Sequence, residues 1–271
     1  MRRLLIRPGA IGDTVLSLPA LQCFEADYTE VWVRGDVVPL IRFAECVRSI
    51  ASTGIDLLGL DGVDPPQALI NRLKSFDSII SWYGSNREEF RAEVRRLELP
   101  VQFFSALPPP DERVHVADYF LAQAGCAGPA VPKIDCPEAP PGDFALIHPF
   151  SSSPRKNWPM ERFQELARRI GMPVRWCAGP EESLEGAVRI ANLYDLACWL
   201  RTARVHVGND SGITHLAAAA GAPVVAIFGP SDPAVWAPRG DRVRVVAGEL
   251  NQVTVDQVLD AVRQVVRESG L

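Results

Sequence analysis

The chain has 271 residues, of which 47% are hydrophobic and 23% are charged. This balance is typical of a globular protein, and the length suits two α/β domains of about 100–150 residues each. The net charge of −5 gives no electrostatic reason to expect nucleic acid, because proteins that bind it carry a basic face. The most apolar segment, residues 213–228, is interrupted by His215, Gly221 and Pro223, so it is too broken to span a bilayer.

The N-terminal residues have basic side chains but neither a long apolar run nor a small-residue cleavage site, so we interpret them as a first strand and not as a signal peptide. These features predict a cytoplasmic protein. No cysteine belongs to a C-x-x-C pair or lies near a histidine at metal-ligand spacing, which favours reduced, buried thiols over disulfides or zinc. The six cysteines are Cys23, Cys46, Cys126, Cys136, Cys177 and Cys198.

Short apolar runs alternate with helical patterns in the N-terminal half, which predicts βαβ units and a parallel sheet. The expected strands are 4–6, 31–33 and 78–81, and the expected helices are 12–24, 38–47, 66–74, 88–98 and 114–124.

A Pro-rich segment, residues 129–142, marks the best candidate for a linker. We therefore predict an N-terminal domain over 1–140 and a C-terminal domain over 141–271, with a ligand-binding cleft between them. The expected strands of the second domain are 144–147, 174–177, 205–207 and 223–228, and its expected helices are 161–170, 196–202, 212–220 and 255–268.

The first loop joins a strand to a helix through Gly9 and Gly12, followed by Asp13. An acid at the C-terminal end of a parallel strand faces the ligand crevice, and the helix dipole stabilises its negative charge. Asp13 is thus a candidate general base toward a hydroxyl, with helix capping as the alternative. The two glycines give only part of a dinucleotide-binding fingerprint, with Asp36 where a ribose-binding acid would lie, so an oxidoreductase stays open as a further alternative.

Two loops of the second half are suited to phosphate. Residues 148–159 contain three serines, among them Ser151 and Ser152, followed by Arg155 and Lys156, which offer hydroxyl donors and positive charge to an oxygen-rich anion. A solvated loop is the plainer interpretation. Residues 208–215 lead from a strand through a polar, Gly-bounded loop into an Ala-rich helix, whose free N–H groups form an anion site.

Together these segments resemble glycosyltransferase family 9, the ADP-heptose:lipopolysaccharide heptosyltransferases. The resemblance covers about residues 1–22 and 144–240 and rests on three ordered motifs: residues 7–13 with 16–21, residues 148–159, and residues 208–238. It implies the GT-B fold, with two Rossmann-like domains whose parallel sheets face each other across a cleft. It further implies an inverting transfer, an acceptor-binding N-terminal domain and a C-terminal domain that binds the nucleotide sugar.

The resemblance also assigns roles to individual residues. Asp13 takes the position of the catalytic base, and Asp210 that of the residue that contacts the donor sugar. Glu182 is similar to the family's ribose-contacting acid. The remaining donor-binding positions concern the diphosphate: Ser151, Ser152, Lys156, Ser211, Gly212 and His215. The implied donor is ADP-heptose, and the implied acceptor is a glycan or a lipid-linked glycan, with a peripheral encounter with the inner membrane.

No Asp-x-Asp pair occurs in the sequence, so we expect a transfer that needs no metal or other cofactor. The segment between Glu182 and Leu196 is short for a helix, a strand and a loop. This shortness motivates one more alternative, a homologue that binds nucleotide sugars without turning them over.

Overall fold

The computed structural model describes residues 1–140 and 142–268, and Pro141, the first residue of the expected C-terminal domain, lies outside this range. The chain forms two compact units. One contains residues 1–10, 17–112 and 116–130, and the other contains residues 11–16, 113–115, 131–140 and 142–268. The domain limits and the separate acceptor and donor roles expected from the sequence stay predictions.

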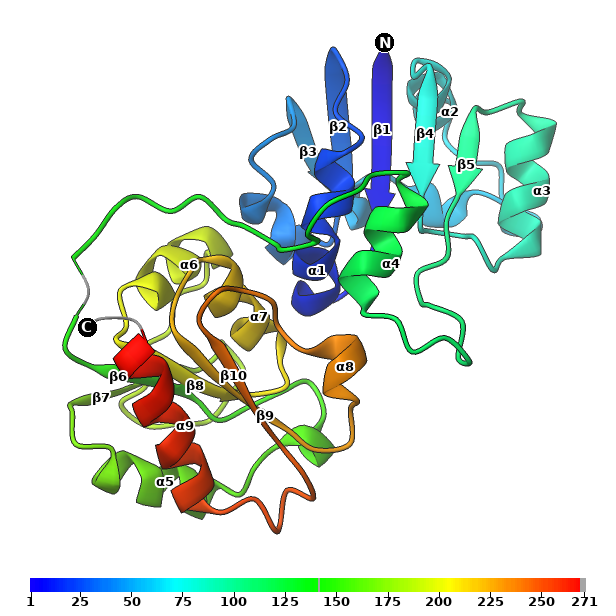
Figure 1. Cartoon of the computed structure of the whole chain (residues 1–271). Helices are drawn as coiled ribbons and strands as arrows, with labels where there is room; N and C mark the ends of the chain where they lie inside the picture. The colour runs from blue at the N-terminus through cyan, green and yellow to red at the C-terminus, as the bar shows by residue number, and fades with distance from the viewer. Residues whose placement is uncertain (141, 269–271) are drawn as a thin grey trace. The chain divides into compact units, whose positions relative to one another are not determined.

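The first unit is built on a parallel sheet with the strand order β3-β2-β1-β4-β5 (Figure 1). Apolar side chains from α2 and α3 pack with those of the central strands into one buried core on one face of the sheet. The strands are β1 (Arg2–Arg7), β2 (Tyr28–Val33), β3 (Cys46–Ser49), β4 (Ser78–Ser81) and β5 (Val101–Phe103). The helices are α2 (Gln67–Lys74), α3 (Glu88–Arg96) and α4 (Val116–Gln123), together with the second part of α1 (Ile11–Gln22), whose residues 11–16 belong to the other unit.

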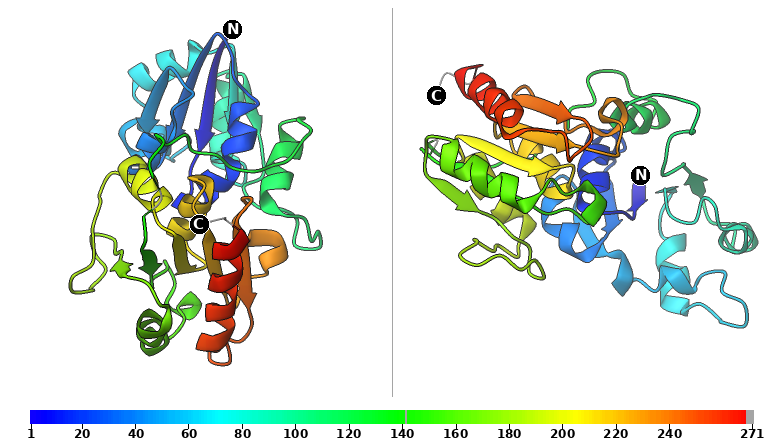
Figure 2. Two further views of the ribbon diagram at one scale, coloured as in Figure 1. Left: turned by 60° about the vertical axis from the view of Figure 1, so that its left-hand side comes forward. Right: turned by 90° about the horizontal axis from the view of Figure 1, so that it is seen from below.

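The second unit contains another parallel sheet, with the order β10-β9-β8-β6-β7, and Figure 2 shows it from two further sides. Helices α5 and α9 bury their apolar stripes against one face. The strands are β6 (Ala145–His148), β7 (Val174–Trp176), β8 (Val205–Asn209), β9 (Val224–Phe228) and β10 (Val243–Ala247). The helices are α5 (Met160–Arg169), α6 (Leu193–Arg201), α7 (Gly212–Ala219), α8 (Pro233–Trp236) and α9 (Val255–Glu268). The prediction of two α/β domains with parallel sheets is confirmed.

The predicted helix over residues 38–47 is wrong. A short 3-10 helix, Gly35–Leu40, is followed by the edge strand β3. Pro39 lies inside this turn and cannot donate a backbone hydrogen bond. Residues 46–49 pair instead with strand β2, which is buried except at its first residue, so that tertiary pairing decides their conformation.

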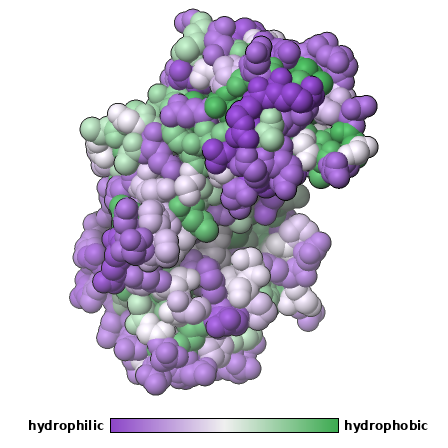
Figure 3. Space-filling view, turned by 90° about the vertical axis from the view of Figure 1, so that its right-hand side faces the viewer, coloured by the Kyte–Doolittle hydropathy of each residue, from purple (hydrophilic) through white to green (hydrophobic). Residues whose placement is uncertain are grey.

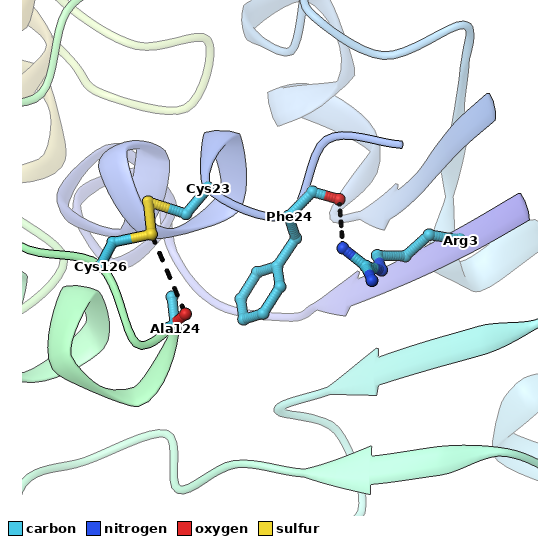
Figure 4. The surroundings of a disulfide bond; sticks show 5 residues. All are labelled: Arg3, Cys23, Phe24, Ala124 and Cys126. Carbon is cyan, nitrogen blue, oxygen red and sulfur yellow. Dashed lines mark hydrogen bonds between the residues drawn. A yellow bond between two sulfur atoms is a disulfide. The ribbon is translucent and has the colours of Figure 1, made fainter. Parts of the chain in front are cut away.

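The expectation that all cysteines are reduced is also wrong, because Cys23 and Cys126 form a disulfide within the first unit (Figure 4). Cys23 follows α1 and Cys126 follows α4, and their Cα atoms lie 6.5 Å apart, within the range that a disulfide spans. The two residues are 103 positions apart, so no local spacing rule indicates the pair. The other four cysteines are free.

Hydrophilic side chains cover most of the surface on the face shown in Figure 3. The large hydrophobic residues that are exposed, such as Leu60, Leu107 and Val245, come from separate parts of the sequence. Among the described residues, no helix combines the length and the apolarity that crossing a bilayer requires.

Candidate functional site

The expected donor-binding residues follow three strands of the second sheet at their carboxyl ends. Ser151, Ser152 and Lys156 come after β6, and Glu182 comes after β7. Asp210 and the start of α7 come after β8. Strand β6 lies between β7 and β8, so the chain leaves β6 toward one side of the sheet and later returns on the other. Such a switch point is where ligands bind in open parallel sheets.

Asp210 lies at the centre of this edge, with only 7% of its side chain exposed. Lys156 donates to its Oδ2 at 2.7 Å, and His215 Nε2 lies 3.9 Å from its Oδ1. Burial alone would raise the pKa of Asp210, but polar interactions with His215, Lys156 and Ser231, together with the charge of Lys156, lower it to about 2. The structure therefore keeps a negative charge here, held by a lysine that is itself 33% exposed.

Helix α7 begins beside this carboxylate. Ser211 is its N-cap, and the Ser211 side chain accepts a hydrogen bond from the Thr214 amide at 3.4 Å. Gly212 allows a close approach, because a Cβ atom on it would lie 2.8 Å from the Cβ of Ile11 in the same unit. The first turn of α7 thus combines free backbone N–H groups, a capping hydroxyl and the nearby Lys156, a combination that favours a bound anion.

The serines after β6 differ from one another. The Ser151 hydroxyl lies 2.7 Å from the carbonyl oxygen of Ser153 and 2.8 Å from Oδ1 of Asn157, so it holds the loop in shape. Ser152 is exposed, and no hydrogen bond to its side chain occurs within the described part of the chain. Of the two, Ser152 has the hydroxyl that is available to a ligand.

Asn209 is a site residue that sequence reasoning missed. Its fully buried side chain accepts from the Trp158 amide at 2.9 Å and donates to the Pro149 carbonyl at 2.8 Å. These bonds fix both ends of the loop that carries Lys156. A buried amide at the end of a strand was the available signal, but its partners are 51 and 60 residues away in the sequence.

Glu182 lies on the loop after β7, with 28% of its side chain exposed. His148, the last residue of β6, donates to it at 3.0 Å. Burial would raise the pKa of Glu182, but the hydrogen bonds from His148 and from the Gly179 amide lower it. The short segment after β7 contains no helix among its described residues, yet it brings this carboxylate to the same sheet edge as Asp210.

Asp13 lies in the first turn of α1 and is half-buried. The turn before it uses Gly9, whose φ of 143° is open to glycine and strained for other residues. The preceding residue, Gly12, approaches α7 so closely that a Cβ atom on it would lie 3.0 Å from Cδ2 of His215. All nine predicted site residues therefore belong to the second unit, while their individual roles stay predictions.

This arrangement combines groups that suit an anion such as a diphosphate with carboxylates at the same sheet edge. Lys156 and the start of α7 supply positive charge to an anion, Glu182 supplies acceptor oxygens to hydroxyl groups, and Asp13 is a candidate proton acceptor. Within residues 1–140 and 142–268, no group of three or more His, Cys, Asp or Glu side chains is arranged to hold a metal ion.

Solved structures show the same fold. The chain superposes on an E. coli ADP-heptose lipopolysaccharide heptosyltransferase II with a TM-score of 0.75, at 18% identity and covering 100% of both chains. It superposes on an E. coli heptosyltransferase solved with ADP with a TM-score of 0.66, at 20% identity and covering 99% of both. These likenesses show a fold of the GT-B type.

The sequence places the chain within that class. Residues 132–261 match the model of glycosyltransferase family 9 (heptosyltransferase). The chain is 24% identical to the lipooligosaccharide heptosyltransferase 2 of Haemophilus influenzae, over 93% of its own length and 91% of the relative's. These matches confirm the resemblance to glycosyltransferase family 9 seen in the sequence and the prediction of a glycosyltransferase, and they disfavour the oxidoreductase. Asp36, the basis of that alternative, is paired with Arg34.

Proposed function

We propose that this glycosyltransferase transfers a heptose, or a closely related sugar, from an ADP-sugar to a hydroxyl of a lipopolysaccharide-type acceptor. The observation that carries the proposal is the carboxyl edge of the second sheet, where Lys156, Asp210 and the start of α7 form one charged site. The names of the relatives support the sugar and the acceptor, and the ADP in a structural neighbour supports the nucleotide.

The proposed reaction is a single displacement that inverts the anomeric carbon. Asp13 removes the proton from the acceptor hydroxyl, whose oxygen forms the new bond to that carbon while the bond to the diphosphate breaks. Lys156 and the N–H groups of α7 stabilise the charge that develops on the leaving ADP, so the reaction as proposed draws on no metal. Because the acceptors of the relatives are lipopolysaccharides, the enzyme would act in the cytoplasm at the surface of the inner membrane.

The test is a transfer assay on Asp13→Ala, with Asp256→Ala as the matched control. Asp256 is likewise a carboxylate in the first turn of a helix of this unit, but it lies on α9 and is paired with Arg169. Loss of a general base lowers the rate by about 10²–10⁴-fold, so we expect a kcat reduced by that factor in Asp13→Ala, with ADP affinity unchanged.

The control should turn over like the wild type, and NMR of the product should show the inverted anomer. A wild-type kcat in Asp13→Ala would contradict the role of Asp13. A wild-type enzyme that turns over no ADP-sugar would contradict the proposed donor.

A further inference from the structure

His148 and Gly179 hold one oxygen of Glu182 and leave the other available. The His148 ring is almost entirely buried, with 3% of its side chain exposed, and its Nε2 lies 3.0 Å from Oε2 of Glu182. The Gly179 amide donates to the same oxygen at 2.5 Å. Within the described residues, no hydrogen bond engages Oε1.

The hydrogen bond to Glu182 also fixes the state of the His148 ring. A carboxylate accepts and does not donate, so Nε2 carries the proton. The other ring nitrogen, Nδ1, is buried with no partner among the described residues. Burying an imidazole ring with one unsatisfied nitrogen costs free energy, and an apolar side chain would fill the same space without that cost. The role that fits this position is to orient the Glu182 side chain.

The backbone around Glu182 is held by other groups. Arg189 donates to the carbonyl oxygens of Glu182, at 2.7 Å, and of Leu184, at 3.1 Å. Val188 forms an isolated parallel bridge with Cys177 at the end of β7. Loss of the His148 ring should therefore release the Glu182 side chain while the loop keeps its place.

The free oxygen of Glu182 selects for a ligand that donates. A carboxylate can pair with the hydroxyls of a sugar but repels a phosphate. The acid after a strand at the switch point of a nucleotide-binding sheet is well placed for ribose hydroxyls. Of the parts of a nucleoside diphosphate, the ribose is the one that matches this group.

We infer that His148 is a positioning residue that orients Glu182 toward the ribose and so gives the enzyme its preference for ribonucleotides over deoxyribonucleotides. The inference rests on the proposed function, because it takes the nucleotide of the donor as the ligand.

The experiment compares the dissociation constants of ADP and 2′,3′-dideoxy-ADP by calorimetry in the wild type and in four variants. A hydrogen bond to a charged group corresponds to about a ten- to hundredfold preference, which we expect of the wild type for ADP. In His148→Leu this preference should fall close to one, because ADP binds more weakly while the dideoxy nucleotide binds as before. The KM for the donor should rise while kcat stays unchanged.

Three further variants separate positioning from packing. His148→Gln places an N–H donor near the site of Nε2 and should restore the preference. The asparagine side chain of His148→Asn is too short to do so, and this variant should behave like His148→Leu. If His148→Leu does not fold, His148→Asn takes its place in the comparison. His206→Leu is the matched control, because this histidine is fully buried but neither of its ring nitrogens has a hydrogen-bond partner among the described residues. It should keep the wild-type preference.

The outcomes distinguish the two proposals. A wild type that prefers ADP, together with a leucine variant that retains this preference, overturns the role of His148 and leaves the proposed function intact. Equal loss in His206→Leu likewise overturns it, since a general cavity effect would then explain the result. A wild type that binds neither nucleotide overturns both proposals.

Discussion

The two units each bury a carboxylate, and the two carboxylates are held in different ways. Glu30 lies within strand β2 of the first sheet with its side chain fully buried, and it is paired with Arg72 and Arg48. Asp210 lies just beyond β8 of the second sheet, and it is paired with Lys156. Burial opposes ionisation in both, and hydrogen-bond donors lower the pKa of both.

The partners of Glu30 all come from its own unit. Trp32 and Tyr28 donate to it alongside the two arginines, so both of its oxygens are engaged within this unit. Asp210 lies at the carboxyl edge, where a ligand can share the Lys156 ammonium group. We therefore expect the buried carboxylate in the middle of a strand to serve the fold, and the one just past the end of a strand to serve binding.

The largest expected difference between the two carboxylates is in their contribution to the stability of the fold. Replacing Glu30 with leucine leaves Arg72, Arg48 and the Trp32 N–H without their acceptor. Loss of one partner of a buried pair costs about 3–5 kcal/mol, and the partial exposure of both arginines places the expected loss near about 3 kcal/mol. Urea unfolding measures it.

Glu88→Gln is the control for this measurement, because it removes an exposed partner of Arg95 and should leave the free energy of unfolding unchanged. ADP affinity should be the same in both variants. Weakened nucleotide binding in folded Glu30→Leu would break the distinction between the two carboxylates.

A smaller effect concerns pH. The pKa of Asp210 is lowered from 3.8 to about 2 in the folded chain, so the folded state binds this proton less readily than the unfolded chain. Its stabilisation is therefore complete above the unfolded pKa and is lost as the pH falls. The shift corresponds to about 2 kcal/mol lost between about pH 5 and about pH 2.

Asp210→Asn removes the titrating group. Between about pH 5 and about pH 2, the free energy of unfolding of this variant should therefore fall by about 2 kcal/mol less than that of the wild type. Urea unfolding at several pH values measures both slopes. Identical slopes in the two proteins would show that Asp210 is not stabilised as a charged group.

Much of the fold could be predicted because its elements have strong local signals. The runs 78–81 and 255–268 match β4 and α9 residue for residue, since apolar periodicity marks both clearly. The missed strands β3, β5 and β10 are short edge strands with partly exposed side chains. Their conformation depends on pairing with a neighbouring strand, which sequence patterns do not reveal.

The residues of the candidate site divide in the same way, into those with a local sequence signal and those that depend on distant partners. Loop chemistry after β6 and β8 located the phosphate-binding candidates, because serines, a lysine and a helix start are visible in sequence order. His148 and Asn209 act through partners on loops that follow other strands, so their roles depend on the sheet order. Ser151 was predicted to bind the diphosphate, and its observed partners within the loop make that role the one most in need of a test.

The most direct test of the charged site is the affinity for ADP of Lys156→Met, measured by calorimetry beside Lys133→Met. Lys133 is an exposed lysine of the same unit and provides the same change in charge. We expect ADP to bind about ten- to a hundredfold more weakly to folded Lys156→Met, as the loss of a charged hydrogen bond implies, and with wild-type affinity to the Lys133 variant. Equal affinities in all three proteins would contradict a nucleotide site at the carboxyl edge of the second sheet.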